Sequence, residues 1–592
     1  ENLINGVNII TACGEFVYDT EIISKENGII WYNLWHPTNK ITRINQNNNS
    51  GVADAIVSTQ QLKEKLPNCK WVAPVAVWFG NSTDISNCII EPRVEFKLNP
   101  VYPTQITLPE DWMVADISRA NANLISSDNG NVRYGGTVND NSIVRYLKYL
   151  KEHGFSIMFY PMMFLDVVNK PWRGYLTGNA DDVNTFFTKD NGYNHFILHY
   201  ANLVKDYCDA FIIGSEMRDL TKIYVEDNNE RTYPAIDCFI ELAKQVRSIL
   251  GNNVKIGYAS DWSEYHHTNG GWYNMDKLWA NKNIDFIGID AYFPLTDKKE
   301  SLITKQDIKD GWTSGEGYDW IYTDNSRTEK ENIESKYAWK NIKWWWENYH
   351  VNPDGKTTEW IPKSKKIWFT EYGFASVDGT TNEPNRFYDP NCMDGGFPRF
   401  SDGQIDYFAQ RRAIQATEEV WANSSMVERK FLWAWDARPY PYFPNKLNLW
   451  ADGNLWYYGH WINGKLGGLI FSNMIKNLFE DAEISTDYLG GVDIYDNIDG
   501  IVLNNRMTVN EVLSILQKIF FFDYYEKDGK LYIFSKKTES SLRIFDDELI
   551  ELEKDVFFKT DIIGNDELPY KIDVSYINKD FNYQISSTYA ER

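Results

Sequence analysis

The sequence lacks the motifs of several large protein classes. Its six cysteines lie far apart and include no C-x-x-C pair, so a disulfide framework or a zinc site is poorly supported. It contains no apolar run of about 18 residues, and therefore no membrane span is indicated. P-loop, G-x-S-x-G and EF-hand motifs are missing as well. We therefore expect neither a metal nor a cofactor.

Positive charge and histidine are also scarce. Lys and Arg together number 60 against 83 Asp and Glu, which gives a formal net charge of −23. A partner such as nucleic acid or an anionic membrane requires a surplus of Lys and Arg, so we expect neither as a main partner. Of the eight histidines, His266 and His267 are adjacent in a predicted loop and are poorly placed to share one metal.

Aromatic residues, in contrast, are abundant. They make up 15% of the chain, with 23 Trp and 37 Tyr. Trp and Tyr stack well on flat, hydroxyl-rich ligands such as sugars, but they also dominate ordinary cores and interfaces. Their number is compatible with a sugar site and does not establish one.

Between residues 55 and 438, apolar strand-like runs alternate with helical stretches. This alternation predicts βαβ units and a parallel sheet. The runs are mostly continuous rather than alternating, which is typical of strands buried on both faces. Eight strand candidates lie at residues 71–79, 112–117, 155–161, 210–216, 254–261, 285–293, 366–373 and 430–436.

Eight strands with intervening helices predict an α/β fold, namely a (β/α)8 TIM barrel with insertions. Helical spacing of apolar residues is clearest at 141–154 and 237–251, and each of these segments ends in a glycine stop signal. The alternative is an open doubly wound sheet, which usually carries a Gly-rich phosphate-binding loop after its first strand. The corresponding segment here, WFGNSTD, is not such a loop.

The character of the sequence changes along the chain and indicates three parts. Residues 1–50 hold short strand-like pieces and an Asn-rich loop, and we expect them to form a strand-rich extension that packs on the barrel. Residues 51–466 form the barrel. Residues 467–592 contain a predicted helix, a hairpin with Asp528-Gly529 as its turn, and further strands. We interpret this last part as one α+β domain and leave open whether it is truncated.

Two glutamates occupy the positions where a (β/α)8 barrel carries its chemistry. Glu216 closes the fourth strand candidate and Glu371 closes the seventh, and active sites of such barrels lie at the C-terminal ends of strands. Both side chains are therefore expected on one rim. Retaining glycosidases need two carboxyl groups about 5–5.5 Å apart. The alternative is that each Glu only ends a strand and pairs with a nearby arginine such as Arg218.

Other strand ends supply candidates for substrate binding. Tyr292 ends the sixth strand, and we expect its hydroxyl to hold Glu371 ionised, since a donor to the charged form favours that form. Trp435 ends the eighth strand and is a candidate sugar platform. Each can instead serve core packing, a loop cap or a structural salt bridge, and so can the remaining candidates, which are Trp78, Asp166, Arg173, Asp261, Trp262, Asp436 and Arg438.

These strand ends are similar to those of the large clan of retaining (β/α)8 glycoside hydrolases. The resemblance implies that Glu216 is the acid/base and Glu371 the nucleophile, with a Tyr on the sixth strand and a Trp on the eighth. Ser215 stands where the clan usually has an Asn that contacts the sugar 2-hydroxyl. The resemblance rests on the segments GSE (214–216), YASDW (258–262), GIDAYFPL (288–295), FTEYG (369–373) and WAWD (433–436).

More specifically, the chain resembles the TIM-barrel-like tail protein of gene transfer agents and related phages, followed by a phage tail-hub domain. This implies a place in the tail of a phage-like particle made in the bacterial cytoplasm, with other tail or baseplate proteins as partners and envelope polysaccharide or peptidoglycan as substrate. The matching segments are YGGTVND (134–140), PWRG (171–174), IIGSEMRDLT (212–221), DWSEYH (261–266), IDFIGIDAYFPLTD (284–297), FTEYGFASVDGTTNEPN (369–385), WAWDARPYPYFP (433–444), GHWINGKLGG (459–468) and, for the hub domain, LPYKIDVSYINKDFNYQ (568–584).

Three functions compete at this point. The first is an active retaining endo-glycosidase in a phage-like tail. The second is a catalytically inactive structural or glycan-binding tail-hub component, which Ser215 and the hub-like C-terminal part favour. A carboxyl spacing well beyond the retaining distance, or a Glu216 occupied by an arginine, supports this second function. The third, an amidase or peptidase, requires a metal or a Cys/Ser–His site, and the sequence indicates neither.

Overall fold

The computed structural model describes all residues except 32–33, 98–104, 129, 325, 467–468, 495–496, 499–500, 504, 537–563, 565–568, 579–583 and 592. The chain divides into two compact units, Glu1–Leu466 and Gly467–Arg592. No helix within the described residues has the length and apolar character needed to cross a membrane.

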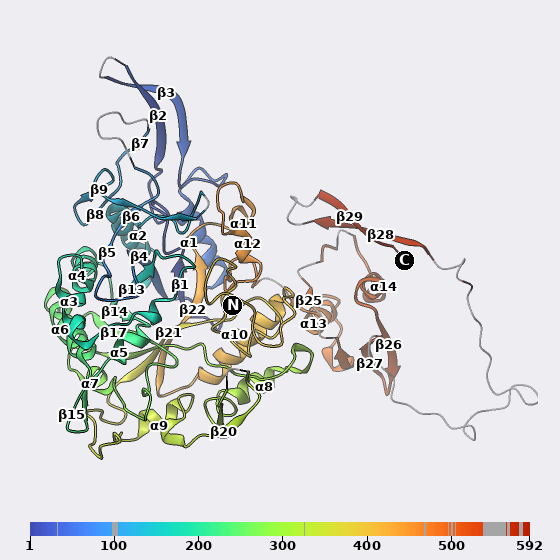
Figure 1. Ribbon diagram of the computed structural model, residues 1–592. Helices are drawn as coiled ribbons and strands as arrows, with labels where there is room; N and C mark the ends of the chain where they lie inside the picture. Colours follow the sequence, from blue (N-terminus) through green and yellow to red (C-terminus); the bar gives the residue numbers. More distant parts are fainter. Residues whose placement is uncertain are drawn as a thin grey trace, which may run out of the picture. The chain divides into compact units, whose positions relative to one another are not determined.

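The first unit is built on a closed barrel of eight parallel strands, seen at the centre of that unit in Figure 1. The predicted α/β class and (β/α)8 barrel are therefore confirmed. β1 pairs with both β22 and β4, which closes the ring. In order around the ring, the strands are β1 (Gly6–Ile10), β4 (Trp71–Gly80), β13 (Ser156–Leu165), β14 (Ala210–Ser215), β17 (Lys255–Asp261), β18 (Phe286–Asp290), β21 (Lys366–Tyr372) and β22 (Val427–Asp436).

One of the eight predicted strands is wrong. Residues 112–117 form a small hairpin of β8 (Met113–Val114) and β9 (Ile117–Ser118), because Ala115 and Asp116 between them adopt positive φ angles of 50° and 61° that belong to a turn. The missing barrel strand is β1. The predicted extension over residues 1–50 therefore contains the first strand of the barrel itself. The apolar pattern alone does not distinguish a short run that forms a barrel strand, such as β1, from one that forms another short element, such as residues 112–117.

Helices cover the outside of the barrel between successive strands. The predicted helices at 141–154 and 237–251 are present as α2 (Asp140–Glu152) and α6 (Pro234–Leu250). α6 begins earlier than predicted because Pro234 stands at its first position, where the missing N–H has no helical partner anyway. Other outer helices are α4 (Tyr193–Val204) and α10 (Tyr407–Trp421).

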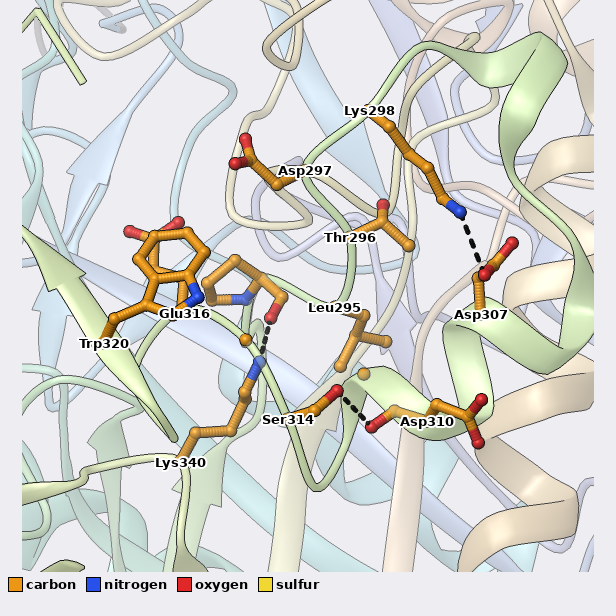
Figure 2. A pocket seen from close by; sticks show the side chains of 13 residues that line it. Leu295, Thr296, Asp297, Lys298, Asp307, Asp310, Ser314, Glu316, Trp320 and Lys340 are labelled. Atoms are coloured by element: carbon orange, nitrogen blue, oxygen red, sulfur yellow. Dashed lines mark hydrogen bonds and ion pairs between the residues drawn. The ribbon is translucent and has the colours of Figure 1, made fainter. Parts of the chain in front are cut away.

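A long insertion follows β18 and includes α8 (Lys305–Gly311) and α9 (Ile342–Glu347). It encloses a hollow of about 190 Å³, shown in Figure 2. Polar contacts tie its wall together: Lys298 pairs with Asp307 at 2.9 Å, and the buried Lys340 donates to the Pro294 carbonyl oxygen at 2.7 Å. Burial lowers the pKa of Lys340 to about 7. The hollow thus belongs to a hydrogen-bonded loop connection.

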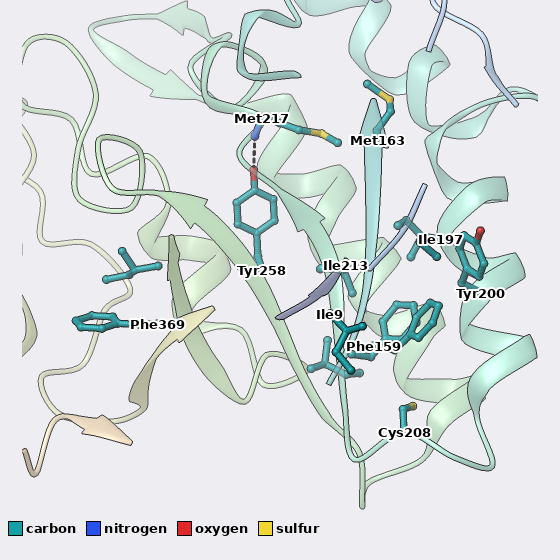
Figure 3. Packing of buried hydrophobic residues seen from close by; sticks show 14 of the residues in the cluster. Ile9, Phe159, Met163, Ile197, Tyr200, Cys208, Ile213, Met217, Tyr258 and Phe369 are labelled. Atoms are coloured by element: carbon teal, nitrogen blue, oxygen red, sulfur yellow. Dashed lines mark hydrogen bonds between the residues drawn. The ribbon is translucent and has the colours of Figure 1, made fainter. Parts of the chain in front are cut away.

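The strands of the barrel serve two apolar layers. Between strands and helices, Phe159 of β13 and Ile213 of β14 are buried together with Ile197 and Tyr200 of α4 (Figure 3). A separate cluster fills the barrel interior, and its members include Val75, Met158, Tyr160, Ile212, Phe286 and Trp368. Alternate residues of each strand therefore face opposite layers, as in other packed barrels.

The second unit is a separate α+β assembly. Its α14 (Val509–Phe520) begins with a capping box and is followed by β26 (Phe522–Lys527) and β27 (Lys530–Ser535). The predicted Asp528-Gly529 turn joins these two strands, and both turn residues have positive φ angles, as a type I′ hairpin turn requires. Further elements are α13 (Phe471–Asp481), β24 (Leu489–Asp493), and the ribbon of β28 (Lys571–Asn578) and β29 (Gln584–Glu591).

The role of β1 in closing the barrel is testable with one substitution. Ile9 is fully buried in β1, so we expect Ile9→Ala to lower the free energy of unfolding by about 2–4 kcal/mol, measured by thermal or denaturant unfolding. The matched control is Leu3, which lies just before the strand and is 45% exposed. Leu3→Ala should change the free energy of unfolding by less than about 0.5 kcal/mol. Equal effects of the two substitutions would contradict a barrel that depends on β1.

Candidate active site

Three buried carboxyl groups meet at the C-terminal end of the barrel. Glu216 directly follows β14, Asp290 ends β18, and Glu371 lies near the end of β21. One carboxyl oxygen from each of the three lies within 4.8 Å of the other two. Their residues are only 7%, 0% and 4% exposed, respectively. The two glutamates predicted to face one another therefore do so, and a third acid, absent from the prediction, joins them.

Bulges in the strands aim these side chains. β14 takes three residue steps from Ile212 to Ser215 while β17 takes two, and β21 takes two steps from Phe369 to Glu371 while β18 takes one. An extra residue of this kind bends a strand and redirects the side chains that follow it. Glu216 itself has a φ of 51°, in the left-handed region that non-glycine residues rarely adopt.

The backbone around Glu216 is held on both sides. The Glu216 amide donates to the carbonyl oxygen of Ala259 at 2.8 Å. The next amide, that of Met217, donates to the hydroxyl of Tyr258 at 3.0 Å, as Figure 3 shows. These contacts fix an unfavourable backbone conformation at a residue that carries a buried charge. Strained residues of this type cluster at functional sites.

Arg173 is the cation of the cluster. Its guanidinium lies 2.8 Å from Glu216 Oε2, which also accepts a 2.7 Å hydrogen bond from Trp172 Nε1. Arg173 donates in addition to the Ser215 carbonyl oxygen at 3.0 Å and to its hydroxyl at 2.7 Å. Carboxylate oxygens are also suitable ligands for hard divalent cations, but here an arginine already supplies the positive charge. The small Ser215 side chain thus serves as an anchor for Arg173.

The other two acids both have raised pKa values. Tyr292 donates to Glu371 Oε2 at 2.7 Å, as predicted. Even so, burial, reinforced by the negative charge of Glu216, raises the pKa of Glu371 to about 8. Burial and the charge of Glu371 also raise the pKa of Asp290 well above its ordinary value. The Tyr292 hydrogen bond lowers the pKa of Glu371, as expected of a donor to the charged form, but burial and like charge outweigh it.

Asp290 is held in place from the barrel interior. The Tyr160 hydroxyl lies 3.1 Å from Asp290 Oδ2 and 3.0 Å from the Ser215 hydroxyl, and Thr370 Oγ1 donates to Asp290 Oδ1 at 2.7 Å. Tyr160 thereby links the carboxyl cluster to the residue that anchors Arg173. Neither Asp290 nor Tyr160 was among the sequence candidates. The sequence signal for Asp290 is its position two residues before Tyr292 in the same predicted strand, 285–293.

The carboxyl pair lies in a pocket of about 560 Å³. Of the predicted rim residues, Arg173, Asp261, Trp262 and Tyr292 line this pocket together with Glu216 and Glu371. Burial and then the charge of Glu216 raise the pKa of Asp261 to about 6. Much of the remaining wall is aromatic, and these side chains are Tyr134, Phe164, Trp172, Tyr175, Phe387 and Trp433.

Four predicted rim residues lie outside the lining of this pocket. Trp78 belongs to the second strand of the ring rather than the first, and it is buried against α4 on the outside of the barrel. Asp166 pairs with Arg93 at 2.5 Å, and Asp436 pairs with Arg438 at 2.8 Å. The contacts of these residues therefore agree with the alternatives stated for them, which are core packing for Trp78 and structural ion pairs for the other three.

Trp435 also lies outside the pocket lining, and Trp433 takes the place expected for it. β22 takes three residue steps from Leu432 to Trp435 while its neighbour β1 takes two, so the strand carries an extra residue there. Trp435 consequently donates to the hydroxyl of Ser58 on α1 (Asp54–Lys65) at 2.9 Å, whereas Trp433 lines the pocket. A bulge changes which residues face a site, and its position is not visible in the apolar pattern.

Comparisons with known families confirm the sequence resemblance. Residues 191–444 match the GTA TIM-barrel-like domain, and residues 508–592 match the family described as putative phage tail protein. The chain is therefore similar to a GTA TIM-barrel-like domain in its barrel and to a phage tail protein in its C-terminal part. A search of curated proteins gave no significant match.

Among solved structures, the barrel is similar to glycoside hydrolases at low identity. A GH113 β-1,4-mannanase is 15% identical, covering 79% of this chain and 96% of its own, with a TM-score of 0.42. The GH113 β-mannanase from Alicyclobacillus acidocaldarius is 13% identical, covering 78% of this chain and 93% of its own, with a TM-score of 0.40. A β-glucuronidase from Ruminococcus gnavus is 10% identical, covering 49% of this chain and 35% of its own, with a TM-score of 0.27. Scores of this size assign no substrate.

The raised pKa of Glu371 predicts a pH-dependent gain in stability for Glu371→Gln. The folded protein retains this proton up to about pH 8, whereas the unfolded chain releases it near the ordinary value of 4.5. Between these pH values the folded state binds more protons, so wild-type stability falls as pH rises, and the glutamine variant escapes that fall. We expect the variant to exceed wild type by roughly 1–3 kcal/mol at pH 8 and by little at pH 4.5.

Unfolding followed by denaturant at several pH values checks this. The control is Glu64→Gln, since the Glu64 side chain is 73% exposed and makes a surface contact only. A difference between Glu371→Gln and wild type that stays constant from pH 4.5 to pH 8 would show that Glu371 titrates normally.

Proposed function

We propose that this chain, in which a glycoside hydrolase-like TIM barrel precedes a phage tail domain, is a retaining glycoside hydrolase of a phage-like particle tail. Its proposed substrate is a cell-envelope polysaccharide or the glycan of peptidoglycan. The observation that carries the proposal is that Glu216 and Glu371 bring carboxyl oxygens within 4.8 Å of each other in an aromatic-lined pocket. Retaining enzymes hold their carboxyl groups about 5–5.5 Å apart, whereas inverting enzymes need about 6.5–9.5 Å.

The proposed reaction has two steps. Glu216 as acid protonates the glycosidic oxygen while Glu371 attacks the anomeric carbon and forms a glycosyl ester. Glu216 then acts as base and takes a proton from the water that hydrolyses this ester. The Tyr292 hydroxyl, 2.7 Å from Glu371 Oε2, stabilises the Glu371 carboxylate when it is released.

The charge distribution of the site is the opposite of the one that this reaction needs. Arg173 faces Glu216, and Glu371 holds a proton at neutral pH because its pKa is about 8. The proposed roles therefore require that Arg173 release Glu216 Oε2 and that the proton pass from Glu371 to Glu216 when the glycan binds. A single water molecule is able to bridge two oxygens within 4.8 Å of each other and so to carry this proton.

The phage tail domain supports assembly with other tail or baseplate proteins. We propose that the chain is made in the bacterial cytoplasm and acts from the assembled tail. In that position a glycosidase would meet the envelope polysaccharide at the moment when the tail contacts a recipient cell.

A glycan-binding tail component without turnover is the second candidate, and one observation favours it. A permanent ion pair between Arg173 and Glu216 at 2.8 Å would keep Glu216 from donating a proton. The pocket would still bind glycans through its aromatic wall. The two functions differ in one measurable respect, which is turnover.

Hydrolysis of purified peptidoglycan, its peptide-free glycan strands and capsular polysaccharides tests the proposal. Wild type should cleave at least one substrate, and Glu216→Gln and Glu371→Gln should each lower kcat by about 10²–10⁴-fold. Glu64→Gln serves as the surface control. Retention is checked by NMR of the first anomer released. Binding without cleavage by wild type would favour the second candidate, and release of the inverted anomer would rule out a retaining mechanism.

The roles of the two glutamates are separable with azide. Glu371→Ala removes the proposed nucleophile, so azide should restore turnover and give a glycosyl azide of inverted configuration. Glu216→Ala removes the proposed acid/base, so azide should give the retained azide, and substrates with good leaving groups should be affected least. Exchanged outcomes would assign the role of proton donor to Glu371, whose pKa is raised to about 8.

Two tryptophans on β22 provide a matched test of the pocket wall. Trp433 lines the pocket, so Trp433→Ala should raise KM or weaken glycan binding by about 10–100-fold with a small loss of stability. Trp435 is 3% exposed and bonded to Ser58, so Trp435→Ala should instead destabilise the fold by about 3–5 kcal/mol. Affinity and unfolding measured on both variants decide the matter, and a binding loss confined to Trp435→Ala would reverse the assignment.

A further inference from the structure

Two loops from opposite sides of the barrel meet at the candidate site. The first, residues 166–176, follows β13, and the second, residues 383–395, follows β21. These strands are four steps apart in either direction around the ring of eight, so the loops begin on opposite sides of the C-terminal rim. Both loops line the pocket that holds the carboxyl pair. We call the joined loops the loop bridge.

Side chains connect the two halves of the loop bridge. Lys170 Nζ lies 3.1 Å from Asp389 Oδ2, and each of these side chains is only 19% exposed. The Tyr175 hydroxyl donates to Asp394 Oδ1 at 2.6 Å. A partly buried ion pair and a hydrogen bond to a carboxylate are stronger links than exposed surface contacts.

The backbone adds to these links, and the second loop is anchored near its start. The Met393 amide donates to the Asn169 carbonyl oxygen at 2.7 Å, and the Cys392 thiol lies 3.3 Å from the Lys170 carbonyl oxygen. On the far side, the Phe387 ring stacks on His460 with ring centroids 4.0 Å apart. The loop bridge is thus tied at both ends and crosses the mouth of the barrel.

We infer that the loop bridge closes one side of the site, so that the pocket accepts the end of a glycan chain and the enzyme is exo-acting. This inference rests on the proposed function and narrows its substrate from any glycan bond to a terminal one. An enzyme that cuts internal bonds needs a groove open on both sides of its carboxyl pair, because the polymer continues past both sugars. The sequence alone led us to expect an endo-acting enzyme.

The pattern of products tests the inference. Whichever polymer of the hydrolysis panel wild type cleaves is followed by size-exclusion chromatography alongside release of short sugars. We expect short products from the first minutes while the average polymer length stays nearly unchanged, and we expect no cleavage when the chain ends are chemically blocked. A rapid fall in average length would overturn the exo-acting inference and leave the glycosidase intact. Absence of any cleavage would overturn both.

Opening the loop bridge supplies the second arm. Lys170→Ala combined with Asp394→Ala removes both side-chain links, and we expect the ratio of internal to terminal cuts to rise about tenfold, since closing loops control access to a site. The matched control is Lys151→Ala. This substitution removes the ion pair between Lys151 and Asp209, which is similar in length at 2.9 Å and lies outside the pocket lining. An unchanged ratio in the double variant, with folding confirmed by circular dichroism, would contradict a closing role for the loop bridge.

Discussion

The mutual repulsion of three buried carboxyl groups is the constraint on which the rest of this site depends. Glu216, Asp290 and Glu371 lie too close together, in too little water, for all three to be ionised at once. Arg173 balances the charge of Glu216, and burial together with like charge raises the pKa values of Glu371 and Asp290. The hydroxyls of Tyr292, Tyr160 and Thr370 orient the carboxyl groups of Glu371 and Asp290 by hydrogen bonds.

Bulges make this cluster compatible with a regular barrel. Strict alternation sends every second residue inward, and a strand can then present few side chains to one point at its end. β14, β21 and β22 each gain one residue relative to a neighbour close to their C-terminal ends, where Glu216, Glu371 and Trp433 occur. The barrel below remains a packed core, and the irregularity is confined to the level where the pocket begins.

The same distinction explains how much the sequence could predict. Seven barrel strands and the positions of Glu216 and Glu371 follow from long apolar runs and from the rule that chemistry occurs at strand ends. β1 is only five residues long, and the longer apolar segment 112–117 has the pattern of a strand although it forms a hairpin. Trp435 was chosen over Trp433 because one inserted residue leaves no trace in composition. The pairing of Arg173 with Glu216 joins separate loops, so only the folded chain reveals it.

The free energy that it costs to bury three acids bears on the choice between an enzyme and a catalytically inactive tail component. Replacing a buried cluster of charged groups by apolar residues is often neutral or stabilising, so a barrel kept only for its shape has no need of three acids. Glu216 also holds an unfavourable backbone angle, and Glu371 Oε1 is buried without a hydrogen-bond partner among the described residues. Arg173 compensates one acid and leaves these other features unexplained. A glycan that donates to Glu371 Oε1 and draws Arg173 away from Glu216 would satisfy the unpaired oxygen and free Glu216, which are the two changes that the proposed turnover requires.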